Sequence, residues 1–516
     1  MSLDSQSQQH PRYTRIRVHK EADFKKLYPL ILDYIREPEL ALSVKEFVFR
    51  CHLPSRVGYL GKRDRADAWK AEEDVRDVSG EHVISQCLTD LGLEGSEKTD
   101  WVRVLTWMKP EIVASRNEAS AREARSYDVE PYIRHRTRLF AHYAAALLLM
   151  LCPNIELIRY EDGSKIIEDI LRRNNYGLLP AVHLQKLREV TLHPTTDEIQ
   201  GDDRFYIHLD ILALLRLFHR LPAIESMSTD GVGPNGRELL DHFPPAISNL
   251  KKIRVGHSIN GTDVIGPLIR VSKHLEEFTF TTGGRCNLEG GHCRRCPETI
   301  GKALYQHRSS LRKVDIDIDE FISRNEADEE DEDWASKDEW YRRDKEISSG
   351  PLTTARMRST RHYGATIGSM HDFESLTHLS IGIGTLLGQY PDEEAPFRLI
   401  DALPRSLEYL LIRGYERGAI ARYDSQIDEF LLAKQDRLPL LKELHGIEKT
   451  VPIAESVDNP DEEEDEEDEE DEDDDDDDDD YKRRIVRLWR PENTDDSWTQ
   501  EPITTGHKRK ASQLSS

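Results

Sequence analysis

Three cysteines stand within the stretch CNLEGGHCRRC at 286–296 and are a candidate for metal chemistry: Cys286, Cys293 and Cys296. Structural zinc sites take four thiolate or imidazole ligands in a tetrahedral array, and C-x2-C is the usual half-site. Only three thiolates are present here, and His292 stands directly beside Cys293, which makes joint ligation awkward. We therefore favour a cysteine-rich loop over a zinc site, and we expect no cofactor.

No other residue pattern indicates catalysis. The stretch 231–236 (GVGPNG) matches G-x-G-x-x-G, but the region where a dinucleotide-binding fold would place an acid, 254–257 (RVGH), contains none. No H-E-x-x-H motif and no P-loop occurs, and the twenty histidines are scattered along the chain. We therefore predict a protein that is not an enzyme.

A six-residue phrase, apolar-x-x-apolar-x-apolar, recurs along the chain. Its clear copies are LREVTL (187–192), LKKIRV (250–255), LEEFTF (275–280), LRKVDI (311–316), LTHLSI (376–381) and LEYLLI (407–412). Weaker copies begin at residues 44, 155, 224 and 441. From residue 155 onward the copies start 25 to 37 residues apart, except for one gap of 65 residues between 311 and 376. Such a period is typical of repeat architectures.

Each phrase ends in an alternation of apolar and polar residues, which predicts a half-buried strand. Between the phrases lie stretches with helical periodicity, such as 206–221 and 297–307. One strand and one helix cannot bury their apolar faces alone, whereas stacked copies can. The predicted fold class is therefore α/β, an irregular solenoid with parallel strands on its concave face and helices on its convex face. A generic βαβ domain is the alternative.

Three stretches carry a resemblance to a known family: HKEADFKKLYPLILDYIREPELALSVKEFVF at 19–49, TIGSMHDFESLTHLSIGIG at 366–384 and LPRSLEYLLIRGYE at 403–416. With the repeated phrases, they resemble the fungal F-box and leucine-rich-repeat-like proteins. The resemblance implies a leucine-rich-repeat solenoid that holds a substrate, and an F-box that recruits the Skp1–cullin machinery. Fewer than twenty, mostly polar, residues precede His19, so we expect the F-box itself to be absent.

Charge is distributed unevenly along the chain. The formal net charge is −27, and an unbroken run of twenty acids occupies residues 461–480. The rest of the chain is therefore only mildly acidic, whereas the run repels itself and cannot form a core. The predicted organisation is a disordered N-terminus (1–18), a solenoid (19–448) with a helical excursion (53–154) and an acidic inserted loop (319–372), and a disordered acidic, then basic, tail (449–516).

The compartment is predicted from what the termini and the apolar stretches contain. Residues 1–12 are polar, so no secretory signal is expected. The most hydrophobic stretch, FAHYAAALLLMLC at 140–152, is too short to span a bilayer and predicts a buried helix. The basic clusters KRR at 482–484 and KRK at 508–510 are candidate nuclear-import signals. We expect an intracellular protein of the nucleus or cytoplasm without membrane contact.

The polar residues between the apolar positions of each phrase are the candidate binding residues, because they point away from the core onto the concave face. They mix both charge signs, which suits a protein partner better than direct contact with nucleic acid. A merely solvated face is the alternative for any one of them. The predicted partner-binding residues are Glu189, Thr191, Lys252, Arg254, Glu277, Thr279, Lys313, Asp315, His378, Tyr409 and Arg413.

The predicted function is a non-enzymatic protein-binding scaffold of the leucine-rich-repeat type, with an unidentified protein partner. Two alternatives stay open. The family resemblance implies a substrate receptor of an SCF-type ubiquitin ligase, with the Skp1–cullin machinery as its partner. The acidic run indicates instead a nuclear histone-binding or chaperone-like protein, which attracts basic nuclear proteins through its tail.

Overall fold

The structure, a computed structural model, describes residues 12–51, 78–106, 129–161, 163–194, 209–233, 239, 243–284, 297–322, 366–389, 397–454 and 498–500. The strands are β1 (Tyr13–Val18), β2 (Glu46–Phe49), β3 (Leu157–Glu161), β4 (Glu189–His193), β5 (Ser226–Val232), β6 (Lys252–Ser258), β7 (Glu277–Thr281), β8 (Lys313–Asp317), β9 (His378–Gly382), β10 (Tyr409–Arg413), β11 (Glu443–His445) and β12 (Thr499–Gln500). The helices are α1 (Glu21–Arg36), α2 (Pro38–Ala41), α4 (Val78–Asp90), α5 (Gly95–Leu105), α7 (Val129–Leu151), α8 (Lys165–Asn175), α9 (Ile211–Leu215), α10 (Thr262–Arg270), α11 (Pro297–Tyr305), α15 (Ile383–Leu387), α16 (Leu399–Ala402) and α17 (Ala421–Arg437), with one 3-10 turn, η3 (Asp319–Phe321).

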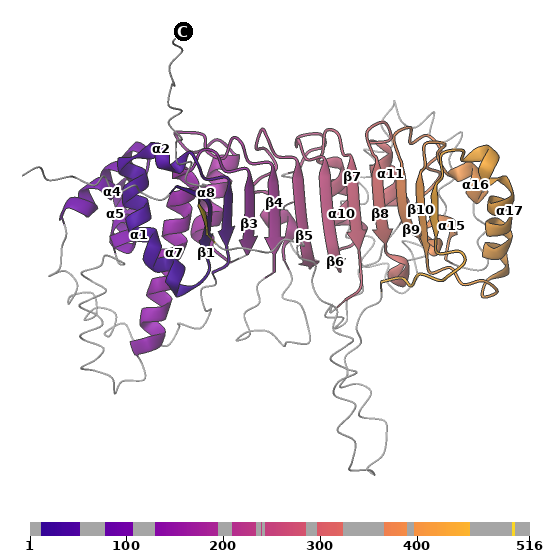
Figure 1. The fold of residues 1–516 in the computed structure, drawn as a ribbon, viewed down its shortest axis with the longest axis horizontal. Helices are drawn as coiled ribbons and strands as arrows, with labels where there is room; N and C mark the ends of the chain where they lie inside the picture. The colour runs from indigo at the N-terminus through magenta and orange to yellow at the C-terminus, as the bar shows by residue number, and fades with distance from the viewer. Residues whose placement is uncertain are drawn as a thin grey trace, which may run out of the picture.

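All twelve of these strands belong to one sheet, in which β1 to β11 follow one another in chain order (Figure 1). Every neighbouring pair from β1–β2 to β10–β11 is parallel, and β12 alone pairs antiparallel, with β1. In Figure 1 the strands face the viewer, and α10 and α11 lie behind them. The α/β solenoid predicted from the repeats is therefore confirmed.

The repeated phrase explains why each strand forms. In the copy at 275–280, Leu275, Phe278 and Phe280 are at most 1% exposed. Glu277 and Thr279, which alternate with them, are half-buried on the opposite side. The apolar positions of successive copies join the helices in one continuous core. A buried Leu or Phe side chain contributes about 2 kcal/mol. Since these side chains are buried against adjacent repeats, each repeat is stabilised mainly by its neighbours.

The solenoid begins earlier than we predicted, because β1 lies inside the stretch 1–18 that we expected to be disordered. Ile16 and Val18 are fully buried, whereas Arg15 and Arg17 alternate with them and are half-buried. Its sequence, YTRIRV, has the spacing of the six-residue phrase, but Tyr13 stands where the other copies have Leu, Ile or Val. The phrase search therefore passed over it, although its alternation is that of a strand.

Two long insertions leave the sheet intact. β2 and β3 are neighbours although α4, α5 and α7 lie between them in the chain, and α7 packs against α1 at the N-terminal end of the sheet (Figure 1). β8 and β9 are also neighbours, so no strand stands between them in the sheet although the chain between them is of double length. The apolar stretch 140–152 lies largely in α7, where Phe140 and Leu147 are fully buried. No helix in the described stretches is long and apolar enough to cross a membrane.

Candidate functional site

The side of the sheet opposite the helices carries rows of mostly polar side chains, and we call it the strand face. Parallel pairing places the residues of neighbouring strands side by side, so each row runs across the sheet. Row one is Arg15, Glu46, Leu157, Glu189, Ser226, Lys252, Glu277, Lys313, His378, Tyr409 and Glu443. Row two is Arg17, Val48, Arg159, Thr191, Ser228, Arg254, Thr279, Asp315, Ser380, Leu411 and His445.

The structure brings all of the predicted partner-binding residues onto the strand face. All but one lie in rows one and two, and Arg413 lies one position beyond row two, beside Gly382. Sequence reasoning did not single out the residues that β1, β2, β3 and β5 contribute, such as Arg15 and Arg159. The signal for Arg159 was present, because it stands in the weak phrase IELIRY that begins at residue 155.

Exposure falls from row one toward the carboxyl ends of the strands. Glu189, Lys252 and Lys313, all in row one, are exposed. Thr191 in row two is only 1% exposed, and Asp317, beyond row two, is 4% exposed. Thr191 therefore lies where the sequence placed it but has no surface to offer a partner. The open part of the strand face is the part near the amino ends of the strands.

The strand face divides into two halves of different character. We call the half on β1 to β6 the arginine half, after Arg15, Arg17, Arg159 and Arg254. We call the half on β7 to β11 the aromatic half, after the rings of His378, Tyr409 and His445 on β9, β10 and β11. Both halves belong to the same run of parallel strands, so their differences come from side chains alone.

Charges in the arginine half are matched by partners on neighbouring elements. Glu46 binds two arginines, with 2.6 Å between its Oε2 and Arg15 Nε and 3.3 Å between its Oε1 and Arg159 Nη2. Arg17 Nε lies 2.9 Å from Asp23 Oδ2. The Arg159 side chain is 8% exposed, so its charge is largely enclosed. The Glu46 pairs join β1, β2 and β3, and the Arg17 pair joins β1 to α1, whereas Glu189 and Lys252 of this half are exposed.

At the border between the halves, Lys252 on β6 binds Glu277 on β7, with 2.9 Å between Nζ and Oε1. The hydrogen bond to Glu277 raises the pKa of Lys252 above its ordinary value. The Lys252 side chain is 51% exposed, so solvent screens the pair and its contribution to stability is small.

The aromatic half carries three rings in contact on neighbouring strands, which we call the aromatic strip. The ring centroids of His378 and Tyr409 are 5.7 Å apart with an angle of 21° between the planes, which is a stacked arrangement. The centroids of Tyr409 and His445 are 5.4 Å apart with an angle of 42°. His378 and Tyr409 are half-buried and His445 is exposed, so part of the ring surface of the strip is accessible to solvent. Aromatic contacts of this kind contribute about 1 kcal/mol beyond the area they bury.

Arg413 bridges two acids beside the aromatic strip. Its Nη1 lies 2.9 Å from Asp315 Oδ1, and its Nε lies 3.5 Å from Asp317 Oδ2. The backbone N–H of Ala454 donates a 2.8 Å hydrogen bond to Asp317 Oδ2. Burial raises the pKa of Asp317 to about 6, although Arg413 and Ala454 both act to lower it. This carboxyl group therefore changes its charge close to neutral pH.

A second buried carboxylate, Asp319, joins the segment that follows β8 to the helix that follows β9. Asp319 accepts hydrogen bonds from the backbone N–H of Gly384 at 2.7 Å, from the backbone N–H of Thr385 at 2.9 Å and from the Thr385 hydroxyl at 2.6 Å. A Cβ at position 382 would lie 2.2 Å from Asp319 Cγ, so the carboxylate needs a glycine there. Burial raises the pKa of Asp319, and the hydrogen bonds oppose this rise. The contacts tie the end of β8 to the first turn of α15.

A histidine–carboxylate pair lies at the carboxyl ends of β5 and β6, and sequence reasoning had not singled it out. His257 Nδ1 lies 3.0 Å from Oδ1 of Asp230, which is 1% exposed. His257 has a φ of 43°, in the left-handed region that non-glycine residues rarely adopt. A Cβ at Gly256 would come within 2.0 Å of Asp230 Oδ1, so this close approach requires glycine. The pair fixes the turn that follows β6.

Thiol and metal chemistry find little support in the described stretches. Cys51, Cys87 and Cys152 are free and buried. Burial raises the pKa of the Cys51 thiol to about 12 and that of Cys87 to about 11, which makes them poor nucleophiles. Within the described ranges, no group of three or more His, Cys, Asp or Glu residues could hold a metal ion.

Several sequence predictions lie outside the described residues. These are the candidate zinc residues Cys286, Cys293 and Cys296, the acidic run 461–480, and the basic clusters at 482–484 and 508–510.

Comparison with known proteins bears on the aromatic half. A family model of a leucine-rich repeat domain matches residues 353–463, which include β9, β10 and β11. The leucine-rich-repeat part of the prediction is confirmed for this region, and the F-box part of the resemblance stays a prediction. A search of curated proteins finds no match to the chain. The aromatic strip therefore lies within the matched repeats.

Proposed function

We propose that the chain is a non-enzymatic scaffold of the leucine-rich-repeat type that binds a protein partner on its strand face, with the aromatic strip at the centre of the contact. The observation that carries the proposal is the strip itself, three rings from neighbouring strands with centroids 5.4 and 5.7 Å apart. Leucine-rich repeat domains are typically protein-interaction modules, which supports this choice.

The composition of the strip matches the residues that dominate protein interfaces. Tyrosine is enriched among the side chains that contribute most to binding, because it offers a large rigid ring and a polar hydroxyl group. Tyr409 is placed between two further rings, so its orientation is supported on both sides. Around the strip, Lys313 and Glu443 in row one supply charges of opposite sign, as in the polar rim of an interface.

The charge pattern favours a protein over a nucleic acid. A nucleic-acid surface presents a continuous basic patch to the phosphates. On the strand face, Glu277 stands between Lys252 and Lys313 in row one, and Asp315 faces Arg413 at 2.9 Å. A partner with charges of both signs would match this surface best.

Affinity purification with substituted chains tests the proposal. The full chain, a Tyr409→Ala variant and a Gln435→Ala variant are compared as bait in cell extract, and the recovered proteins are quantified by mass spectrometry. Gln435 is exposed on α17, away from the strand face, and serves as the matched control. We expect a defined set of proteins to fall at least about tenfold with Tyr409→Ala, because truncation of a tyrosine at the centre of an interface costs about 2 kcal/mol. The same proteins should persist with Gln435→Ala.

Recovery of the same proteins by all three baits would contradict the proposal. Thermal unfolding of the three chains is measured in parallel, because a loss of partners has the expected meaning only if Tyr409→Ala remains folded. A second variant, His445→Ala, at an exposed position of the same strip, should reduce recovery of the same set.

A further inference from the structure

The outer edge of β1 is occupied by a segment from the far end of the chain. β12 pairs antiparallel with β1, and Tyr13 stands opposite Gln500 while Arg15 stands opposite Thr499. The Thr14 hydroxyl also donates to the backbone carbonyl oxygen of Thr499, at 3.3 Å. An unpaired sheet edge exposes backbone N–H and C=O groups and readily accepts an added strand. Here the chain supplies that strand itself.

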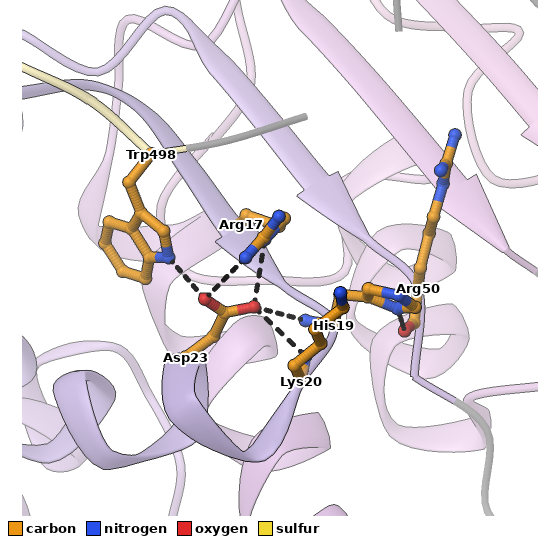
Figure 2. Close-up of polar contacts among 6 residues, drawn as sticks. All are labelled: Arg17, His19, Lys20, Asp23, Arg50 and Trp498. Atoms are coloured by element: carbon orange, nitrogen blue, oxygen red, sulfur yellow. Dashed lines mark hydrogen bonds and ion pairs between the residues drawn. The ribbon is translucent and has the colours of Figure 1, made fainter. Parts of the chain in front are cut away.

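Trp498, which precedes β12, makes three side-chain contacts beside this edge. Its indole Nε1–H donates a 2.9 Å hydrogen bond to Asp23 Oδ1 (Figure 2). Its ring meets the Tyr13 ring edge-on, with centroids 4.9 Å apart and an angle of 68°. Lys26 Nζ lies 5.1 Å from the centroid of the Trp498 ring, within range of a cation–π interaction. Asp23 binds the indole N–H, Tyr13 packs edge-to-face with the ring, and Lys26 lies over the ring face. Only tryptophan offers both the N–H donor and the large ring, so the contacts together favour tryptophan.

The carboxylate that accepts from Trp498 is also held by three groups on β1 and at the start of α1. Asp23 Oδ2 accepts from Arg17 Nε at 2.9 Å and from the backbone N–H groups of His19 and Lys20 at 3.3 and 3.0 Å (Figure 2). Burial acts to raise the pKa of Asp23, but the hydrogen bonds from Arg17, Lys20 and Trp498 outweigh burial and leave it below the ordinary value. Asp23 is thus a preorganised, ionised acceptor.

We propose that the outer edge of β1, together with Asp23, Tyr13 and Lys26, is a docking site for an extended, tryptophan-bearing segment, and that its ligand is the chain's own segment 498–500, bound in cis. Backbone pairing to β1 supplies the strand addition, and the tryptophan contacts supply the specificity. The contact is short, so we infer that it exchanges with a free state and is not a permanent part of the core.

The chain is also anchored ahead of the acidic run, at residues 451–454. Val451 accepts a 2.8 Å hydrogen bond from the backbone N–H of Gly414, and Ala454 donates to Asp317, so the chain is anchored on the aromatic half at that point. The acidic run 461–480 stands between this anchor and Trp498 along the chain. Docking of 498–500 therefore fixes the chain on both sides of the acidic run, and release frees one side.

Peptide binding to the full chain tests the proposal. The probe is a fluorescein-labelled peptide of residues 494–504 (TDDSWTQEPIT), and binding is followed by fluorescence anisotropy. We expect saturable binding to full-length Trp498→Ala, in which the internal ligand is weakened. Wild-type chain should bind the peptide at least about tenfold more weakly, because the tethered segment competes at a high effective concentration. A peptide with alanine in place of tryptophan should lose at least about tenfold in affinity.

Two substitutions in the site check the contacts. In the Trp498→Ala chain, Asp23→Asn should weaken peptide binding at least about tenfold, because the charge on the acceptor is lost. Lys26→Ala, at an exposed position, should weaken it about threefold without affecting folding. Gln435→Ala, at an exposed position on α17, is the control and should change nothing.

Three results would overturn the proposal. The first is equal affinity of the peptide for wild-type and Trp498→Ala chains, and the second is equal affinity of the tryptophan and alanine peptides. The third concerns the source of the segment. Light scattering should find wild type and Trp498→Ala to be monomers, and a wild-type dimer that Trp498→Ala dissociates would show that a second copy supplies 498–500.

Discussion

The arginine half and the aromatic half of the strand face share one backbone plan but use their polar residues differently. In the arginine half, Glu46 binds Arg15 and Arg159 across three neighbouring strands, so the charges satisfy one another. In the aromatic half, the rings of the strip stack on each other and keep part of their surface open. The Glu46 cluster of the arginine half is thus paired internally, whereas the aromatic half exposes part of its ring surface.

The two halves also differ in what fixes them. The acids of the aromatic half, Asp317 and Asp319, are 4% and 6% exposed and bind backbone N–H groups of later segments. In the arginine half, the side chains of Arg15 and Glu46 are 17% and 16% exposed. We therefore expect substitutions of acids to cost more in the aromatic half.

The largest difference should appear between Asp319→Ala and Glu46→Ala. Asp319→Ala leaves the N–H groups of Gly384 and Thr385 buried without their acceptor, so we expect it to lower the free energy of unfolding by about 3 kcal/mol. Glu46→Ala should cost less, about 1–2 kcal/mol, because Arg159 is largely enclosed but Arg15 and Glu46 are partly accessible to solvent. Urea unfolding of both variants measures the difference. Equal losses would show that the two halves are held in the same way.

The next effect concerns binding. Tyr409→Ala should weaken the binding of a purified partner by about 2 kcal/mol, which corresponds to an increase in Kd of about thirtyfold. Arg254→Ala in the arginine half should weaken it by less than about 0.5 kcal/mol, because we place it outside the centre of the contact. Isothermal titration calorimetry measures both values. A larger loss for Arg254→Ala would move the binding centre to the arginine half.

A smaller effect is expected from pH, through Asp317. Its pKa is about 6 in the folded chain and about 3.9 for an unfolded aspartate, so the folded state holds the proton more tightly. This contribution to stability is fully present below about pH 4 and is lost as the pH rises through about 6. Asp317→Asn should therefore stabilise the chain at pH 8 by about 1–2 kcal/mol and have little effect at pH 4.

Urea unfolding of wild type and Asp317→Asn at the two pH values measures this linkage. A variant that is destabilised at pH 8 would mean that the negative charge on Asp317 is needed by Arg413. The aromatic half would then depend on ion pairs as the arginine half does.

The smallest effect is expected at the border between the halves. Lys252→Ala removes the pair with Glu277, but the two side chains are 51% and 34% exposed, so solvent screens the pair. The free energy of unfolding should fall by less than about 0.5 kcal/mol, and the change should shrink further in 1 M salt. A loss above about 1 kcal/mol would show that the two halves are coupled through this pair.

Sequence was sufficient for the repeat architecture because the repeat is local. The phrase at 275–280 became β7, and even the weak copy at 224–227 became part of β5. Strict alternation then placed Glu277, Lys313 and Tyr409 on one face in register. These features depend only on spacing within a repeat and on the stacking of like units.

The remaining features depend on contacts between residues far apart in the chain. Thr191 alternates with apolar neighbours as the other candidates do, yet it is buried, and alternation alone cannot reveal this. The role of Asp319 requires Gly384, across the insertion. β12 has two residues and no pattern of its own, and its partner β1 stands at the other end of the sequence.

Site-specific photo-crosslinking tests whether a protein partner contacts the strand face at the aromatic strip. A photoreactive phenylalanine analogue replaces Tyr409 in the aromatic half, Lys252 at the border, or Gln435 on α17, and each chain is irradiated in cell extract. We expect one crosslinked protein at position 409, a weaker product with the same protein at 252, and none at 435. A crosslink at 435 with none at 409 would contradict binding on the strand face.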